Sequence, residues 1–221
     1  MARVFMYVVD RDFGFAPNPF HGVCTLATCK PKIRGVARHG DWVVGMGGRR
    51  LKATGKCIFA MRVDRIMQFK DYWLDPQFYC KRPVRNGSRK MLIGDNIYHI
   101  NEDGIWIQAD SHHSLEDGSP NMINLSNDTS RDAVLLSEYF FYFGTQAPEI
   151  PQEILNQMEW VNRVGHRNYD FEKTGHLIID WILNNHIRFL NLVMADPFDF
   201  AISSQRFSPG VVNSNSHIRI N

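Results

Sequence analysis

The sequence predicts an α+β protein in which a β-rich region over residues 1–150 comes before a helical segment. Two apolar runs, at 42–44 and 57–63, indicate neighbouring strands joined by a glycine-rich, basic turn. After residue 150 the apolar side chains recur at helical spacing. We therefore expect a strand-rich domain over 1–150, a helical extension over 151–202 packed on it, and a flexible tail over 203–221.

The elements before the central strands can be assigned from their composition. Residues 3–10 are apolar on both faces, which is typical of a central strand. A loop with three phenylalanines follows. Pro31 then favours the first turn of a short basic helix, with Thr28 as a candidate cap and Gly40 closing the segment.

The second half of the β-rich region gives weaker signals. Residues 64–78 predict a change from strand to short helix, and the basic loop that follows contains Asn86-Gly87, a tight-turn signal. A hairpin is expected over 97–107. The polar stretch 115–132 shows no periodicity and is predicted to be a loop, whereas 133–144 favours one late strand. In the helical segment, the clearest helix is expected over residues 171–192.

Charge is distributed unevenly along the chain. Residues 1–100 carry 18 Lys and Arg against 7 Asp and Glu, a net +11, whereas residues 101–221 carry a net −9. The basic half favours an anionic partner, nucleic acid or a nucleotide. The alternative is that the two halves pack together and partly neutralise each other.

Several classes of protein are disfavoured. No apolar run reaches the roughly 18 residues of a membrane span, and the start does not resemble a signal peptide, so we expect a cytoplasmic protein without membrane contact. The four cysteines are scattered, which favours reduced thiols. His21, Cys24 and Cys29 lack the spacing of a deaminase zinc site, so neither a metal nor another cofactor is expected. The oligomeric state cannot be predicted.

Specific segments resemble known families. A Gly-Asp pair opening a strand, with a long return strand, resembles the PUA-like barrel families, which include the ASCH, EVE and YTH relatives. FGFAPNPFHGVCTLATCKPKIR, HGDWVVGMGG, DYWLDPQF, GDNIYH and DSHHS are together similar to nucleotide modification associated domain 2, a bacterial and phage family, over about residues 3–150. The resemblance implies a PUA-like mixed β-barrel with flanking short helices, in a base-modification or defence setting. It implies no particular reaction.

The candidate binding residues are those able to stack on a base, contact its polar edge or hold a phosphate. For the base or nucleotide we expect Tyr7, Asp10, Phe13, Asn18, Phe20, Arg34, Trp42, Asn96, Tyr98, His112 and His113. For phosphates we expect Arg49, Arg50, Arg82, Arg85 and Arg89. Trp42 has two interpretations, a pocket wall or a core side chain, and the loop phenylalanines likewise either line a pocket or fill the core.

Two classes of function follow from these residues. The first is a module that recognises a modified base or nucleotide, with modified DNA as the expected target. The second is an enzyme of hydrolase or glycosylase type acting on such a base. Its candidate catalytic residues are Asp41, His112 and His113, because a histidine beside a carboxylate can act as a general base. Asp95 and Asp110 are further candidates for that carboxylate.

Overall fold

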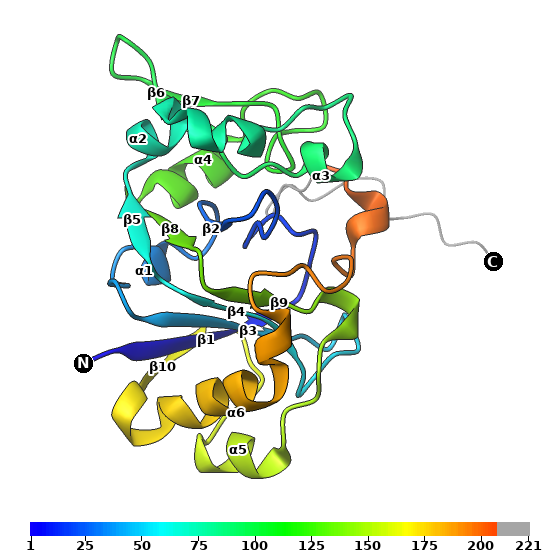
Figure 1. Ribbon diagram of the computed structural model, residues 1–221. Helices are drawn as coiled ribbons and strands as arrows, with labels where there is room; N and C mark the ends of the chain where they lie inside the picture. Colours follow the sequence, from blue (N-terminus) through cyan, green and yellow to red (C-terminus); the bar gives the residue numbers. More distant parts are fainter. Residues whose placement is uncertain (207–221) are drawn as a thin grey trace, which may run out of the picture.

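Five strands form the central sheet of the computed structural model, which describes residues 1–206 (Figure 1). Their order is β10-β1-β3-β4-β9; β1 and β3 run parallel, and the other neighbours run antiparallel. Runs of β-branched and aromatic residues, buried on both faces, explain why β1, β3 and β4 lie at the centre. The strands are β1 Arg3–Val9, β3 Trp42–Gly47, β4 Cys57–Arg62, β9 Phe140–Tyr142 and β10 His166–Asp170.

Two smaller sheets lie on one side of this central sheet. A three-stranded antiparallel sheet has the order β2-β8-β5, and a hairpin pairs β6 with β7. Their strands are β2 Cys24–Leu26, β5 Arg65–Met67, β6 Tyr98–Ile100, β7 Trp106–Gln108 and β8 Val134–Ser137. The helices are α1 Pro31–Arg34, α2 Phe69–Leu74, α3 Arg89–Leu92, α4 Met122–Thr129, α5 Gln152–Gln157 and α6 His176–His186.

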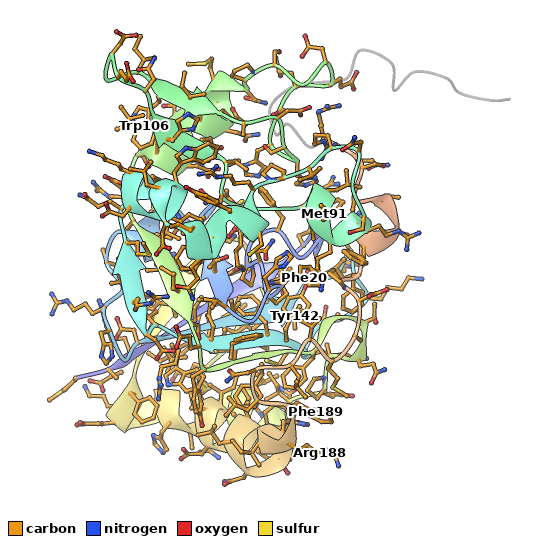
Figure 2. All side chains as sticks on the ribbon, turned by 45° about the horizontal axis from the view of Figure 1, so that its top comes forward. Phe20, Met91, Trp106, Tyr142, Arg188 and Phe189 are labelled. Atoms are coloured by element: carbon orange, nitrogen blue, oxygen red, sulfur yellow. The ribbon has the colours of Figure 1, made fainter. Side chains whose placement is uncertain are left out.

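Two hydrophobic clusters hold these layers together. In Figure 1, α5 and α6 cover the lower face of the central sheet, while the smaller sheets with α2 and α4 stand above it. The first cluster joins the central strands to Ile178 and its neighbours on α6. The second fills the upper part around Phe69. Figure 2 shows Phe20 and Tyr142 in the interior between these parts, and Phe189 at the helical end.

The α+β class is confirmed, but the predicted PUA-like barrel is not. Within residues 1–206, β10 and β9 are the two edges of the central sheet and no pairing joins them, so the sheet stays open. A barrel needs continuous strand pairing around its circumference. Here β10 pairs along β1, where the sequence pattern predicted only helix. The sheet therefore ends at a strand from the C-terminal segment.

The predicted strand over 133–144 divides into two. β8 joins the three-stranded sheet and β9 joins the central one, and the break falls at Glu138, whose backbone N–H donates to Asp64 Oδ2 at 2.8 Å. The predicted helix over 171–192 is shorter than expected, because α6 is preceded by a π-helical turn, Phe171–Gly175. α4 forms inside the stretch predicted to be a loop.

The remaining predictions on chain organisation are not decided by this fold. The division at residue 150 stays a prediction, and the predicted tail over 203–221 lies outside the described residues from 207 onward. Among the described helices, none is long and apolar enough to cross a membrane.

Candidate active site

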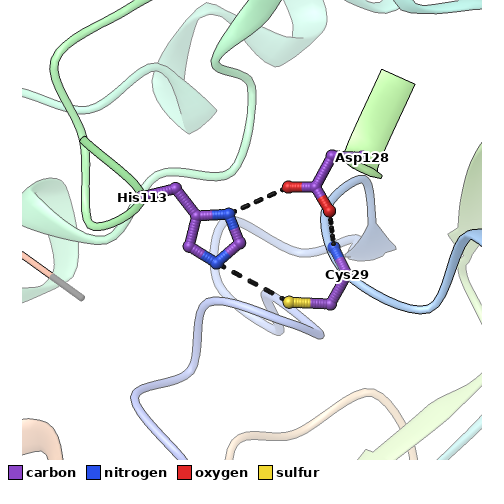
Figure 3. A group of neighbouring side chains, drawn as sticks. All are labelled: Cys29, His113 and Asp128. Carbon is purple, nitrogen blue, oxygen red and sulfur yellow. Dashed lines mark hydrogen bonds and ion pairs between the residues drawn. The ribbon is translucent and has the colours of Figure 1, made fainter. Parts of the chain in front are cut away.

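Three side chains from separate parts of the chain meet in one cluster. Cys29 follows β2, His113 lies in the turn after β7, and Asp128 is near the end of α4. Cys29 Sγ is 3.6 Å from His113 Nε2, and His113 Nδ1 is 2.9 Å from Asp128 Oδ2. Figure 3 shows the imidazole ring between the thiol and the carboxylate. A thiol, an imidazole and an orienting carboxylate in this order are the components of an activated cysteine nucleophile.

Asp128 organises the cluster through both of its carboxylate oxygens. Besides His113, it accepts a hydrogen bond from the backbone N–H of Cys29 at 2.7 Å and one from the hydroxyl of Tyr98 at 2.9 Å. Asp128 and Tyr98 are fully buried, so these bonds are formed away from water. The carboxylate thus fixes the backbone of the thiol and the orientation of the imidazole together.

Arg34 also holds the cluster together, through hydrogen bonds to backbone carbonyls. This buried guanidinium donates from Nε to the carbonyl of Cys29 at 2.8 Å and from Nη2 to the carbonyl of Asp128. Its Nη1 donates to the carbonyls of Arg131 and Ala133. The planar fork of arginine suits several acceptors held at fixed angles. Arg34 therefore ties the loop that carries the thiol to the segment that carries the carboxylate.

The backbone at the thiol has an unusual conformation. Cys29 and Lys30 have consecutive positive φ angles of 55° and 45°, in the left-handed region that non-glycine residues rarely adopt. Lys30, rather than the predicted Thr28, occupies the N-cap of α1, and no side chain caps this helix. Strained backbone of this kind concentrates at functional sites, where the surrounding structure holds it in place.

The charges in the cluster favour a protonated imidazole. Burial of the ring works to lower the pKa of His113, but Cys29 and Asp128 outweigh it and raise the pKa to about 10. Burial also works to raise the pKa of Asp128, yet the charge of His113, aided by Arg34, holds it below its usual range. At neutral pH, His113 is therefore an imidazolium, with its Nε2 facing Cys29 Sγ.

The neighbouring histidine is in the opposite protonation state. Burial lowers the pKa of His112 to about 3, and the charge of His113 adds to the effect. His112 Nδ1 donates to the carbonyl of Gln205 at 2.7 Å, so the neutral ring carries its proton on that nitrogen. Two adjacent histidines thus supply one cation and one neutral imidazole.

The cluster opens onto a cavity of about 390 Å³. This volume lies within the range of roughly 300–1,000 Å³ found for small-molecule sites. The side chains of Cys29, His113 and Asp128 form part of its wall, and the loop after β1 supplies much of the rest. The other lining residues used below are Tyr7, Asp10, Asp12, Phe13, Phe15, Lys30 and His112.

The same three residues also have the donor types of a metal site, with ligand atoms within 4.8 Å of one another. Their arrangement fits a metal less well. The thiol contacts Nε2 of His113, and Asp128 contacts the other ring nitrogen. If an ion were bound between Cys29 Sγ and His113 Nε2, Asp128 would not be one of its ligands. Its carboxylate would contact the other ring nitrogen, as carboxylates do when they orient metal-binding histidines. Two direct ligands are fewer than the three or four of zinc sites.

The structure brings five of the predicted base-binding residues to this cavity. They are Tyr7, Asp10, Phe13, His112 and His113, and they come from β1, the loop after it and the turn after β7. Two more, Arg34 and Tyr98, support the cluster through the hydrogen bonds described above. Their role in binding a base stays a prediction.

Other predicted residues lie elsewhere and have structural partners. Trp42 is 6% exposed and packs edge-to-face on a tyrosine in the core, so the structure does not bring it into this cavity. Asn18 and Asn96 are buried and donate to backbone carbonyls, and Phe20 packs in the second cluster. Asp41 accepts hydrogen bonds from an arginine side chain and from two backbone N–H groups. It is not positioned beside either histidine of the turn.

The predicted phosphate-binding arginines are not gathered in one place. Arg49 and Arg89 are exposed. Arg50 forms an ion pair with a carboxylate of the C-terminal segment, Arg82 lies over two aromatic rings, and Arg85 donates to two backbone carbonyls. Binding of phosphate by these side chains stays a prediction.

Three residues of the site were missing from the sequence-based set of site residues. Cys29 was considered only as a zinc ligand, and Asp128 lay in a predicted loop. Lys30 was one of the basic side chains of the short helix expected to face either solvent or a ligand. A signal for α4 was present, since Asn121 accepts hydrogen bonds from two N–H groups of its first turn. No pattern linked Asp128 to a cysteine 99 residues earlier.

Comparison with known proteins places the chain in a family. A family model described as nucleotide modification associated domain 2 matches residues 1–204. No curated protein and no solved structure gives a significant match. The matched range includes the whole cluster and the segments whose composition resembled this family. The chain therefore belongs to the nucleotide modification associated domain 2 family, which is named for its association with nucleotide modification.

Proposed function

We propose that the protein is an enzyme of hydrolase type that acts on a modified base or nucleotide through nucleophilic attack by Cys29. The observation that carries the proposal is the Cys29–His113–Asp128 cluster in the wall of a cavity of about 390 Å³. A module that only recognised a base would not require an imidazolium held against a thiol in a strained loop. The family, which is named for its association with nucleotide modification, supports a modified base or nucleotide as the substrate.

The chemical steps follow from the positions of the three groups. Cys29 Sγ forms a bond to an electrophilic carbon of the substrate while the bond from that carbon to the leaving group breaks. His113 Nε2 lies on the thiol side of the ring and donates its proton to the leaving group. A water molecule, deprotonated by the now neutral His113, then displaces Cys29 and completes the hydrolysis. Asp128 keeps the ring oriented and stabilises its charged form throughout.

Recognition of the base belongs to the same cavity in this proposal. Phe13 and Phe15 pack against His112, with ring centroids 4.2 and 5.2 Å apart, and all three rings line the cavity. Aromatic walls of this kind suit a flipped or free base. We further propose that the protein works in the cytoplasm of a bacterium or an infected host, on modified DNA or its nucleotides. A basic first half favours such an anionic substrate.

The test is turnover of a defined panel of substrates. Wild-type protein and the Cys29→Ser variant are incubated with deoxynucleoside monophosphates and oligonucleotides that carry 5-substituted pyrimidines or N6-substituted adenines. Mass spectrometry follows the products and any adduct on the peptide that contains Cys29. We expect loss of the base substituent or of the base with wild type, and a reduction of at least about a hundredfold with Cys29→Ser. Equal turnover by both proteins would show that Cys29 is not the nucleophile, and binding without turnover across the panel would favour the recognition module instead.

A further inference from the structure

Lys30 differs from the other buried or half-buried cations near the site in its lack of hydrogen-bond partners among residues 1–206. Its side chain lines the cavity, directly after the nucleophile in the sequence, with Nζ 4.3 Å from the centre of the Tyr7 ring. Among residues 1–206, the Lys30 ammonium has no hydrogen bond or ion pair. Arg34, by contrast, donates to four backbone carbonyls, and Lys81 donates to backbone and side-chain oxygens around it.

The position of this cation is fixed by the fold. The positive φ angles at Cys29 and Lys30 place the two side chains on a strained turn held by Arg34 and Asp128. The face of the Tyr7 ring attracts the ammonium and further limits its movement. Burial of the ammonium lowers the pKa of Lys30, and the neighbouring Cys29 acts against that shift. Among residues 1–206, no anionic oxygen forms a hydrogen bond or ion pair with this ammonium. An anionic group of a ligand would supply the missing contact.

We infer that Lys30 is an anion-binding group of this cavity, and that the substrate is a phosphate ester of a nucleoside rather than an uncharged nucleoside or base. The inference rests on the proposed function for the identity of the substrate. The phosphate belongs either to a free nucleoside monophosphate or to a nucleic-acid backbone, because both present the same anionic oxygens. Lys30 holds this group beside the thiol, while the aromatic side of the cavity takes the base.

The first experiment measures the charge beside the thiol with two alkylating reagents. Iodoacetate is an anion and iodoacetamide is neutral, and peptide mass spectrometry separates modification of Cys29 from that of the exposed Cys80. One positive charge a few ångströms from the reacting sulfur favours the anion by about five- to tenfold. The iodoacetate-to-iodoacetamide rate ratio at Cys29 should therefore be about five- to tenfold higher in wild type than in a variant without the Lys30 ammonium, while the ratio at Cys80 stays the same in both proteins.

Matched variants assign that preference to one residue. Lys30→Met removes the ammonium and keeps much of the length of the side chain. Its rate ratio at Cys29 should fall about five- to tenfold below the wild-type ratio, because the His113 imidazolium stays beside the sulfur in both proteins. Lys32→Met removes an exposed lysine from the same short helix and should leave the ratio unchanged. A ratio at Cys29 that is the same in wild type and in Lys30→Met would overturn the inference.

The second experiment measures binding without using the thiol. Calorimetry compares dCMP, dTMP, the two corresponding nucleosides and a short single-stranded oligonucleotide. We expect the monophosphates or the oligonucleotide to bind at least about fivefold more tightly than the nucleosides, and Lys30→Met to abolish this difference. Whether the monophosphates or the oligonucleotide bind more tightly identifies the source of the phosphate. Nucleosides that bind as well as every phosphate-containing ligand, or no binding of any phosphate ester, would overturn the inference.

The two proposals fail in distinguishable ways. If Cys29 is no more reactive toward iodoacetamide than Cys80 and turnover survives Cys29→Ser, the proposed nucleophile is wrong, whatever Lys30 binds. If Cys29 is reactive and required but its preference for anions is the same in wild type and in Lys30→Met, the enzyme proposal stands and the role of Lys30 is wrong.

Discussion

Replacing Asp128 with asparagine should lower the pKa of His113, because the Asp128 carboxylate raises this pKa both by its charge and by its hydrogen bond. The carboxylate is 2.9 Å from Nδ1 and fully buried. A charge-assisted hydrogen bond contributes about 1.5–3 kcal/mol, and two pKa units correspond to about 2.7 kcal/mol. From a starting value of about 10, we therefore expect the pKa of His113 to fall to about 8 or below in Asp128→Asn.

This fall is large enough to measure directly. At pH 9 the protonated fraction of His113 should drop from about nine-tenths to about one-tenth or less. Nuclear magnetic resonance of protein labelled with ¹⁵N-histidine follows both ring nitrogens between pH 5 and 11. Asp117→Asn, the same change at an exposed carboxylate, is the matched control and should leave the titration unchanged. A His113 that titrates near 6.5 in wild type, or that stays above 9 in a folded Asp128→Asn variant, would refute the reasoning.

Two further predictions concern groups outside the cavity. Burial raises the pKa of Asp95 to about 6, so its protonation stabilises the fold below about pH 4, and that contribution is lost as the pH rises through 6. In urea unfolding, Asp95→Asn should therefore gain roughly 2 kcal/mol relative to wild type between pH 4 and pH 7, and a pH-independent difference would contradict the assignment. Trp42→Ala should cost about 3–5 kcal/mol of stability, because Trp42 is a core side chain, and its folded fraction should keep wild-type reactivity at Cys29. A Trp42→Ala protein of normal stability that has lost nucleotide binding would instead place Trp42 at the ligand.

The central strands could be predicted because their sequence signals are local. Apolar runs identified β1, β3 and β4, and the turn at Glu102–Gly104 identified the hairpin of β6 and β7. The openness of the sheet was not predictable in this way. The open sheet depends on β10, a strand of five residues without a continuous apolar run. This segment becomes a strand through its pairing with β1. Tertiary contacts of this kind override weak local propensity.

The candidate site was only half predictable for a similar reason. His113 stood out as a histidine beside other polar residues, but its partner carboxylate is on α4, a helix whose polar sequence gave no periodic signal. Met122 and Ile123 of α4 are exposed, and Leu125 is the one buried apolar residue of this helix, which is too few for a periodic signal. Cys29 carries no motif of its own. Its chemistry arises from a histidine 84 residues away, which only the folded chain brings within reach.

The rate at which iodoacetamide modifies Cys29, relative to Cys80 in the same molecule, tests the central claim most directly. Cys80 is exposed, whereas Cys29 is half-buried, so accessibility alone would make Cys80 the faster thiol. A thiolate held by the His113 imidazolium reverses this order. We predict that at pH 7 Cys29 reacts at least about tenfold faster than Cys80, and that His113→Gln, which keeps a hydrogen-bond donor but loses the charge, removes the advantage. A Cys29 that reacts more slowly than Cys80 in wild type, or equally fast with and without His113, would contradict the account.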